Sequence, residues 1–392
     1  MDKKYLIVNT GSASKKYALY AGGKEVCKAH FEKEDGKLVV TFTAGLQRNK
    51  KNITQAEYGA SIRYLLELLQ AKKIISAKSD IEMIGLRVVA PGDYFLSSCV
   101  VDKTYFNKLK ASEQEAPLHI HPIIAEIRQL KKILPGVQVV GVSDSAFHAN
   151  MPFQSKLYSL PEKVVRRFGM YRYGYHGISM QSILPKVKSL LGELPSKMII
   201  CHLGSGSSIA AVENGVSIDT SMGFTPLEGV PMGTRIGNID AGAVIYLAQK
   251  LGLSLRQLET YFNSKCGLLG LSGKTADVRE LIKLEKAGDR KAKIALETFV
   301  YHIKKYIGAY SAALNGLELL VFTATIGERS FIMRSRICSE LEGLGIALDE
   351  KKNDKLVGSD GFIHEKRAPV KIAVIHTDEM GEIARQMLKC KI

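Results

Sequence analysis

Two short segments rich in glycine and serine have the composition of phosphate-binding turns. The first contains Gly11, Ser12 and Ser14 and is followed by Lys16, and the second spans residues 202–208. Each lies between two apolar runs, so we expect both turns to join β-strands. Glycine lets the backbone approach an anion closely, and successive N–H groups in such a turn form an anion-binding concavity. One turn alone is more often an ordinary polar hairpin, but two of them favour phosphate binding.

Two arginines and a histidine have the hydrogen-bond donors that an anionic substrate needs. Arg87 interrupts an apolar run, where a charged side chain requires either an ion-pair partner or a ligand. Arg235 ends a segment dense in glycine and proline, residues 225–235, and long ordered loops are usually functional. His176 lies between glycines and tyrosines, which indicates a rigid loop, although a lone histidine is more often structural.

Two carboxylates and a third glycine turn complete the set of candidates. Asp144 and Glu379 each follow an apolar run, which places them at the C-terminal ends of strands, where α/β sheets bind ligands. Both carry the oxygen donors that Mg²⁺ prefers. Residues 320–329 predict a strand, a turn and then a helix, whose N-terminus is suited to a phosphate group.

The elements that would position these residues occur twice. Residues 5–10 and 198–203 predict strands that end at the two glycine turns, which lie almost half the chain apart. Residues 54–69 predict a helix that begins with a capping box, and residues 214–215 predict a hairpin turn. We interpret the repetition as a duplicated domain that forms two similar lobes with a ligand-binding cleft between them.

Composition narrows the class of protein. Of the 392 residues, 46% are hydrophobic and 24% are charged, which excludes disorder as the main state. Because no long apolar run or signal peptide is present, we expect a cytoplasmic protein without membrane contact. The six cysteines are scattered and show neither metal-binding nor disulfide spacing. The net charge of +16 suits anionic ligands, but no nucleic-acid-binding motif accompanies it, so we expect no nucleic-acid partner.

These segments together resemble the acetate and propionate kinase family, which belongs to the superfold of sugar kinases, actin and heat-shock ATPases. The resemblance extends from Ile7 to Glu379 and beyond. Its most specific parts are residues 173–177, 220–229 and 232–235, and it is supported by residues 116–119, 144–148 and 202–204.

The resemblance implies an α/β architecture, namely a duplicated, two-lobed, ribonuclease-H-like fold of the actin-like ATPase type with a central cleft. The N-terminal lobe would comprise residues 1–148, with residues 379–392 returning to it. The C-terminal lobe would comprise residues 149–378 and would carry both the nucleotide site and the interface of a homodimer.

The resemblance also implies a role for each candidate residue. The catalytic residues would be Arg87, Asp144, His176 and Arg235, with Arg87 also binding the substrate carboxylate. The acyl chain would lie in an apolar pocket formed by Val89, Leu118, Tyr175 and Pro226. Asn9 and Glu379 would hold Mg²⁺, with Mn²⁺ as an alternative. ATP or ADP would contact Ser12, Ser14, Lys16, His202, Leu203, Gly204, Ser205, Gly206, Asp277, Val278, Arg279, Thr325, Ile326, Gly327, Glu328 and Arg329.

The implied reaction is reversible transfer of the γ-phosphoryl group of ATP to acetate, which gives acetyl phosphate and ADP. Propionate or butyrate is the alternative acceptor, since one methylene group changes binding by only about 1–3 kcal/mol. A remoter alternative is a nucleotide-binding regulator without turnover, because Ala13, Ser205 and Thr325 depart from the usual nucleotide turns of the family. The retained candidates for catalysis and metal binding favour the enzyme.

Overall fold

The computed structural model describes residues 3–11, 14–34, 36–114 and 116–390, apart from the side chains of Gln114 and Leu118. The chain divides into two compact units. Unit 1 comprises Met1–Ala146 and Asp378–Ile392, and unit 2 comprises Phe147–Thr377. The chain therefore passes from one unit to the other twice, after Ala146 and after Thr377.

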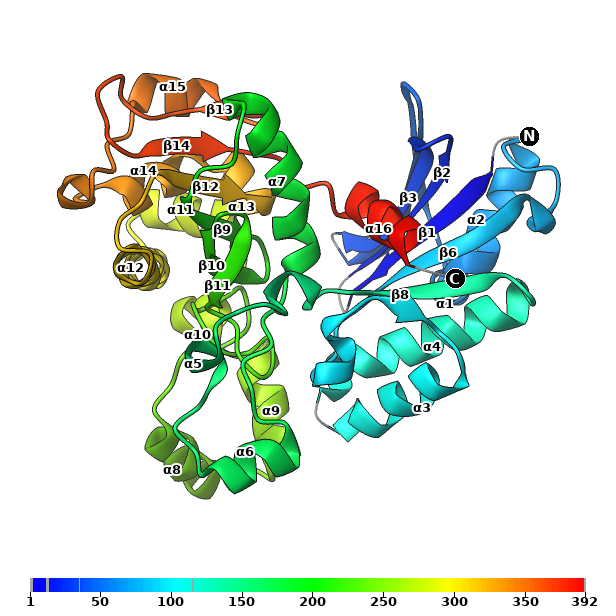
Figure 1. The fold of residues 1–392 in the computed structure, drawn as a ribbon, viewed down its shortest axis with the longest axis horizontal. Coiled ribbons are helices and arrows are strands. Elements are labelled where there is room, and N and C mark those ends of the chain that lie inside the picture. The colour runs from blue at the N-terminus through cyan, green and yellow to red at the C-terminus, as the bar shows by residue number, and fades with distance from the viewer. Residues whose placement is uncertain (1–2, 12–13, 35, 115, 391–392) are drawn as a thin grey trace. The chain divides into compact units, whose positions relative to one another are not determined.

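Unit 1 is built on a sheet with the strand order β5-β4-β3-β2-β1-β6-β8-β7 (Figure 1). The strands are β1 (Lys4–Thr10), β2 (Ser14–Ala21), β3 (Lys24–Glu34), β4 (Lys37–Ala44), β5 (Gln47–Asn52), β6 (Ile81–Val88), β7 (Cys99–Val100) and β8 (Gln138–Ser143). The first five strands form an antiparallel meander, β6 and β8 run parallel to β1, and β7 is antiparallel to β8.

Helices cover both faces of this sheet. They are α1 (Gln55–Gly59), α2 (Ser61–Ala71), α3 (Lys103–Ala111), α4 (Pro117–Ile133) and α16 (Glu379–Lys389). Apolar residues of α2, α3 and α4 share one core with Leu6 and Val8 of β1. On the other face, α16 packs Ile383 and Met387 over Gly85, next to Ile7. Because side chains alternate along a strand, β1 is buried on both faces.

Unit 2 is built on a sheet with the strand order β11-β10-β9-β12-β14-β13. The strands are β9 (Lys197–Leu203), β10 (Ser207–Glu213), β11 (Val216–Thr220), β12 (Leu319–Thr323), β13 (Gly361–Phe362) and β14 (Lys371–Val374). Strands β9, β10 and β11 are antiparallel, β12 and β14 run parallel to β9, and β13 is antiparallel to β14.

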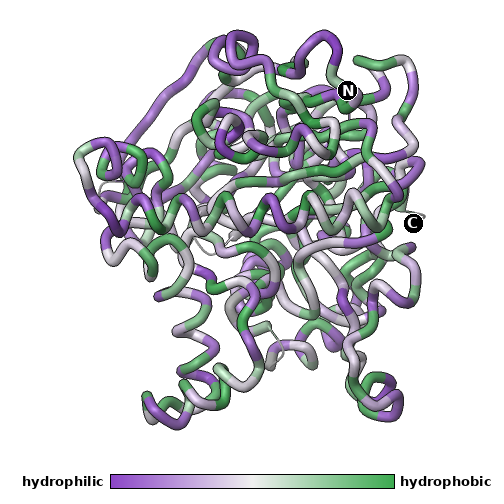
Figure 2. The backbone as a smooth tube through the Cα atoms, turned by 90° about the vertical axis from the view of Figure 1, so that its left-hand side faces the viewer, coloured by the Kyte–Doolittle hydropathy of each residue, from purple (hydrophilic) through white to green (hydrophobic). Residues whose placement is uncertain are grey.

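Unit 2 has helices on both faces of its sheet and further helices away from it (Figure 1). They are α5 (Phe153–Lys156), α6 (Glu162–Phe168), α7 (Gly177–Leu191), α8 (Ala241–Leu251), α9 (Leu255–Ser264), α10 (Gly267–Ser272), α11 (Val278–Lys286), α12 (Arg290–Ala313), α13 (Ala324–Arg329), α14 (Phe331–Cys338) and α15 (Glu350–Lys355). Apolar residues of α10, α11, α12 and α14 share the core of one face, and α7 packs on the other. Hydrophilic and hydrophobic residues alternate along several helices, as amphipathic packing requires (Figure 2).

The two sheets repeat one topology. The order β3-β2-β1-β6-β8 in unit 1 matches β11-β10-β9-β12-β14 in unit 2, with the same strand directions. In each unit the strand at the centre ends at one of the two glycine turns. The duplicated α/β fold expected from the sequence is therefore confirmed.

The two repeats exchange their last helices. Helix α7 follows β8 of unit 1 in the chain, yet it packs on the sheet of unit 2. Helix α16 follows β14 of unit 2, yet it packs on the sheet of unit 1 (Figure 1). Each sheet is thus completed by a helix from the other half of the sequence, which makes the connecting segments part of the architecture.

Candidate active site

The candidate residues of unit 1 are connected through the Arg87 guanidinium. Arg87, near the end of β6, donates from Nε to Asp144 Oδ1 at 3.1 Å and from Nη2 to Asp144 Oδ2 at 2.8 Å. Asp144 is buried just beyond β8. Burial disfavours the charged guanidinium, but Asp144 and Glu379 outweigh this effect and raise the pKa of Arg87 above its ordinary value. Arg87 is therefore a fixed positive charge.

Asn9 connects this ion pair to the N-terminus of α16. Its Oδ1 accepts from Arg87 Nη1 at 3.3 Å, and its Nδ2 donates to Glu379 Oε2 at 2.8 Å. Next to Asn9, the buried Thr10 Oγ1 makes no hydrogen bond to any part of the chain that the structure describes. The amide, hydroxyl and carboxylate oxygens gathered here are the hard donors that Mg²⁺ requires, so these residues fit the ion.

The first glycine turn joins β1 to β2, as its sequence predicts. Lys16 is paired across the two strands with Asn9, and its side chain is exposed. Ser14 is the first residue of β2, and Ser12 lies outside the described residues. Val89, which follows β6, is half-buried against the core of unit 1. Leu118 is on α4, and its side chain also lies outside the description.

In unit 2, two histidines stack beside the second glycine turn. The rings of His176 and His202 lie 4.1 Å apart and nearly parallel. His202 Nδ1 contacts Ser179 Oγ at 2.8 Å, and His176 Nδ1 contacts Ser208 Oγ at 3.0 Å. Each ring is therefore held through Nδ1. His176 also has a left-handed backbone, with φ of 60°, which turns the chain into α7.

Gly206 is the point at which His176 and Arg235 meet. A Cβ atom on this glycine would lie 3.2 Å from His176 Nε2 and 3.5 Å from Arg235 Nη1. Arg235 Nη1 also donates to the carbonyl of Pro226 at 3.1 Å. Tyr175 is buried, and its hydroxyl donates to the carbonyl of Phe224 at 2.6 Å. The glycine- and proline-rich loop thus places Arg235 against the turn.

The third glycine turn lies against the second one. Strand β12 pairs with β9 so that Thr323 faces His202, and a Cβ atom on Gly204 would lie 3.7 Å from Ala324 Cβ. The other candidates here, apart from Glu328, differ in exposure. Ser205, Thr325 and Arg329 are exposed, Gly206 and Ile326 are half-buried, and Leu203, Gly204 and Gly327 are buried.

The remaining candidates begin α11. Asp277 caps this helix by accepting from Arg279 N at 2.8 Å, and it also pairs with the Arg279 guanidinium at 2.6 Å. The hydrogen bond from the Arg279 guanidinium is the largest influence on Asp277, and it holds the pKa of this carboxyl below its usual value. Val278 is part of the buried core. Ala276 Cβ would lie 3.5 Å from a Cβ atom on Gly233, which places the start of α11 beside the loop that carries Arg235.

Several buried polar residues support these segments, although sequence reasoning did not single them out. Arg172 pairs with Glu228 at 2.7 Å, which holds the loop before Arg235. Arg334 of α14 is fully buried and donates to the carbonyls of Gly327 and Glu328 at 2.9 and 3.0 Å. Burial lowers the pKa of Arg334 to about 10. The sequence signalled only a charge within a short helix, which is common on surfaces.

Comparison with known proteins identifies the family. The sequence model of the acetokinase family matches residues 4–385. The chain belongs to the acetokinase family. It is 40% identical over 393 residues to an acetate kinase from Bacillus cytotoxicus, covering 98% of each chain. It is 42% identical over 394 residues to an acetate kinase from Carboxydothermus hydrogenoformans, again covering 98% of each.

Solved structures of this family share the fold. An acetate kinase from Porphyromonas gingivalis superposes with a TM-score of 0.87 at 33% identity, covering 98% of this chain and 99% of the other. A propionate kinase from Francisella tularensis superposes with a TM-score of 0.90 at 34% identity, covering 99% and 100%. Membership of this family makes the chain a kinase.

The described residues contain neither a membrane-spanning helix nor a preformed metal cluster. Within the described ranges, no helix is long and apolar enough to cross a membrane. Among the same residues, no three histidine, cysteine, aspartate or glutamate side chains gather into a ready-made metal cluster. Mg²⁺ commonly binds through one or two protein oxygens together with substrate phosphates, so the second result is compatible with the Asn9 and Glu379 pair.

We predict that Arg334→Met lowers the free energy of unfolding by at least about 2 kcal/mol, because it leaves buried carbonyls without donors. Urea denaturation measures the loss. The matched control is Arg336→Met on the same helix, which removes a partly exposed ion pair with Glu285 and should cost less than about 1 kcal/mol. Equal losses in the two variants would contradict the structural role of Arg334.

Proposed function

We propose that this protein transfers the γ-phosphoryl group of ATP to acetate and forms acetyl phosphate and ADP, in a reversible reaction. The observation that carries the proposal is the Arg87 guanidinium, fixed by Asp144 through two hydrogen bonds. Membership of the acetokinase family agrees with it. The relatives described above are named acetate kinases and a propionate kinase.

The nucleophile in this reaction needs no general base. A carboxylic acid of pKa about 4–5 is already ionised at neutral pH. Its attack on the γ-phosphorus is opposed by the negative charge of the phosphate oxygens. The protein must therefore bring two anions together and stabilise the transferred group, for which positive charges and hydrogen-bond donors suffice.

Three side chains supply those charges and donors. Arg87 would bind the carboxylate of the acceptor and the phosphoryl group in transit. His176 and Arg235, which meet at Gly206, would donate to the equatorial oxygens of that group. The second ring nitrogen of His176 is held by Ser208, which favours one orientation of the imidazole.

Asp144 would act through Arg87. Its two oxygens both accept from the guanidinium, and it is buried. A carboxylate turned toward the substrate would repel acetate, whereas one turned toward Arg87 fixes the orientation of the arginine. We therefore assign Asp144 to positioning rather than to proton transfer.

The nucleotide would bind along the glycine turns and the start of α11. The turn after β9 and the start of α13 lie against each other, and the loop of Gly233 extends them toward Ala276. Backbone N–H groups at these positions, with Lys16 from the first turn, provide donors for phosphates.

Asn9 and Glu379 would hold Mg²⁺. The ion, when bound, neutralises charge on the phosphates. Glu379 already accepts from Asn9 Nδ2, which fixes its carboxylate beside the Asn9 side chain. Mn²⁺ prefers the same oxygen donors and remains the alternative ion.

Propionate and butyrate remain alternative acceptors. Val89, Leu118, Tyr175 and Pro226 are the proposed lining of the acyl pocket. The propionate kinase structure is 34% identical to this chain, and the acetate kinase structure is 33% identical. The cytoplasmic location expected from the sequence also stays a prediction.

The acceptor is tested by measuring acyl hydroxamate formed from formate, acetate, propionate and butyrate with ATP and Mg²⁺. We expect acetate to give the highest kcat/KM, with propionate lower by about tenfold, the order of magnitude of one methylene group. A higher kcat/KM for propionate would assign the alternative acceptor. No product from any acid would reject the kinase activity and favour a nucleotide-binding regulator.

We expect Arg87→Ala and Arg235→Ala each to lower kcat by about 100-fold or more, the effect of removing a donor to the transition state. Initial rates at saturating ATP and acetate measure this. Arg63→Ala in unit 1 and Arg367→Ala in unit 2 remove exposed arginines and serve as controls. Turnover within a few-fold of the controls would remove the arginine concerned from the mechanism.

We further propose that the protein forms a homodimer through unit 2. Exposed apolar side chains gather on the consecutive helices α8 and α9, where Leu255 is 81% exposed, Ile245 63% and Tyr246 58%. A patch of this kind on a folded protein usually marks an interface. Analytical ultracentrifugation should show a dimer, and Ile245→Glu with Leu255→Glu should shift it to monomer. A monomeric parent protein would refute the proposal.

A further inference from the structure

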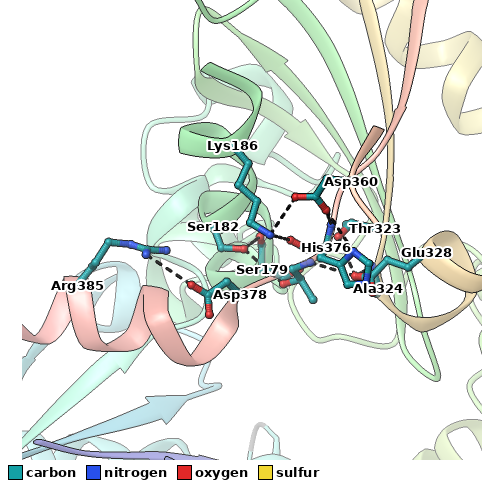
Figure 3. Close-up of polar contacts among 11 residues, drawn as sticks. Ser179, Ser182, Lys186, Thr323, Ala324, Glu328, Asp360, His376, Asp378 and Arg385 are labelled. Atoms are coloured by element: carbon teal, nitrogen blue, oxygen red, sulfur yellow. Dashed lines mark hydrogen bonds and ion pairs between the residues drawn. The ribbon is translucent and has the colours of Figure 1, made fainter. Parts of the chain in front are cut away.

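The last two residues of unit 2 are held through their backbone by three charged side chains (Figure 3). Asp360 Oδ1 accepts from His376 N at 2.7 Å, and Lys186 Nζ donates to the His376 carbonyl at 2.8 Å. Glu328 Oε1 accepts from Thr377 N at 3.0 Å. We call Lys186, Glu328 and Asp360 the linker clamp, because they hold the segment that connects β14 to α16.

The members of the linker clamp come from different elements and are themselves connected. Lys186 lies on α7, Glu328 on α13, and Asp360 directly before β13. Lys186 Nζ pairs with Asp360 Oδ2 at 3.3 Å. The His376 ring lies between the two carboxylates, with Nδ1 3.1 Å from Asp360 Oδ1 and Nε2 3.4 Å from Glu328 Oε2. Charges of alternating sign thus surround the linker and fix its path.

Glu328 differs from the other two members because it also holds the nucleotide turn. The same oxygen that accepts from Thr377 accepts from Ala324 N at 2.9 Å. Ala324 has a φ of 63°, a left-handed conformation that a residue with a Cβ atom adopts only when its surroundings enforce it. Glu328 is 7% exposed, and its carboxylate is turned into unit 2. Its hydrogen bond from Ala324 N therefore stabilises the left-handed conformation of the turn.

The linker leads directly to a candidate metal ligand. Thr377 is the last residue of unit 2, and Glu379 follows two positions later as the first residue of α16. Asp378 caps this helix by accepting from Gly381 N at 3.0 Å. Thr377, whose N–H the linker clamp holds, is thus the residue directly before the N-cap of α16.

We propose that Glu328 is a positioning residue that holds the turn at Ala324 and the linker at Thr377 through one carboxylate oxygen, and does not itself contact the nucleotide. The inference rests on the proposed placement of the nucleotide at the turns. In this arrangement Asp360 positions only the linker, because its contacts are to His376 and Lys186.

Variants of Glu328 can distinguish a positioning role from a direct charge contact with the nucleotide, because its hydrogen bonds from Ala324 N and Thr377 N need an acceptor oxygen and not a charge. Two backbone N–H groups, of Ala324 and Thr377, and the Thr323 hydroxyl at 3.5 Å donate to one oxygen, Glu328 Oε1. Glutamine keeps an acceptor oxygen at that position and removes the charge, alanine removes the acceptor, and aspartate shortens the side chain by one methylene. Positioning predicts that glutamine functions and that alanine and aspartate do not, whereas a direct charge contact predicts that all three fail.

The test measures ADP binding by titration calorimetry and kcat by the hydroxamate assay. We expect Glu328→Ala and Glu328→Asp to lower kcat and to weaken ADP binding by about tenfold or more, the order of magnitude for the lost hydrogen bond from Ala324 N to a charged acceptor. Glu328→Gln should stay within about threefold of the parent in both. Asp360→Ala should leave ADP binding unchanged, since it touches the linker but not the turn. Glu297→Ala on α12 is the surface control.

Hydrogen exchange gives a readout that does not depend on turnover. In Glu328→Ala, peptides that cover Ala324 and Thr377 should exchange faster, and in Asp360→Ala only the linker peptide should do so. Equal impairment of ADP binding by glutamine and alanine would overturn the proposal, and so would unchanged exchange and binding in alanine. An inactive parent that still shows these ADP and exchange effects would reject acetate phosphorylation but keep the positioning role. If Glu328→Ala does not fold, Glu328→Asp carries the same comparison.

Discussion

The bidentate hydrogen bond between Arg87 and Asp144 is the interaction on which the chemistry of unit 1 depends. A site that binds two anions needs positive charge before either anion arrives, and a buried charge is costly unless it is paired. Asp144 stabilises the guanidinium by accepting hydrogen bonds from Nε and Nη2. The third nitrogen, Nη1, donates to Asn9 Oδ1 instead. The arginine is thereby fixed in orientation, and its connection continues to Glu379.

Unit 2 offers a different set of hydrogen-bond donors. The stacked rings of His176 and His202 are each anchored through Nδ1 to a serine. Arg235 Nη1 donates to the carbonyl of Pro226. The duplicated topology gives both units a glycine turn after the central strand, but only the side chains around each turn decide its chemistry. The two units thus share one topology, but the hydrogen-bond donors around their glycine turns differ.

Local patterns in the sequence predicted the elements better than they predicted contacts. The strand expected at residues 5–10 is β1, and the hairpin expected at residues 214–215 joins β10 to β11. The capping box at Thr54 and Glu57 is present, but it begins the short α1 rather than one continuous helix, because α2 starts separately at Ser61. Capping is a local hydrogen bond that four residues determine, whereas the length of a helix depends on the core against which it packs.

The supporting contacts of the site could not be predicted in this way. Arg334 donates to residues 6 and 7 positions before it and to Asn353 far beyond it, and no local pattern specifies such a network. Glu328 was predicted with the nucleotide turn from the resemblance to a family, which places a residue in a segment but does not say where its side chain points. Its carboxylate points inward to Ala324 and Thr377.

The exchange of α7 and α16 between the two repeats explains why the linker requires so many charged contacts. A helix that completes the sheet of the other unit must leave its own unit at a defined point, or its register on the receiving sheet is lost. Apolar packing fixes α16 through Ile383 and Met387, but these lie beyond its first turn. The start of the helix is held instead by the hydrogen bond from Asn9 Nδ2 to Glu379 Oε2 and by the Asp378 cap, and the linker before it is held by hydrogen bonds to the backbone of His376 and Thr377. Hydrogen bonds are directional where apolar contacts are not, so these bonds fix backbone positions that apolar packing alone leaves open.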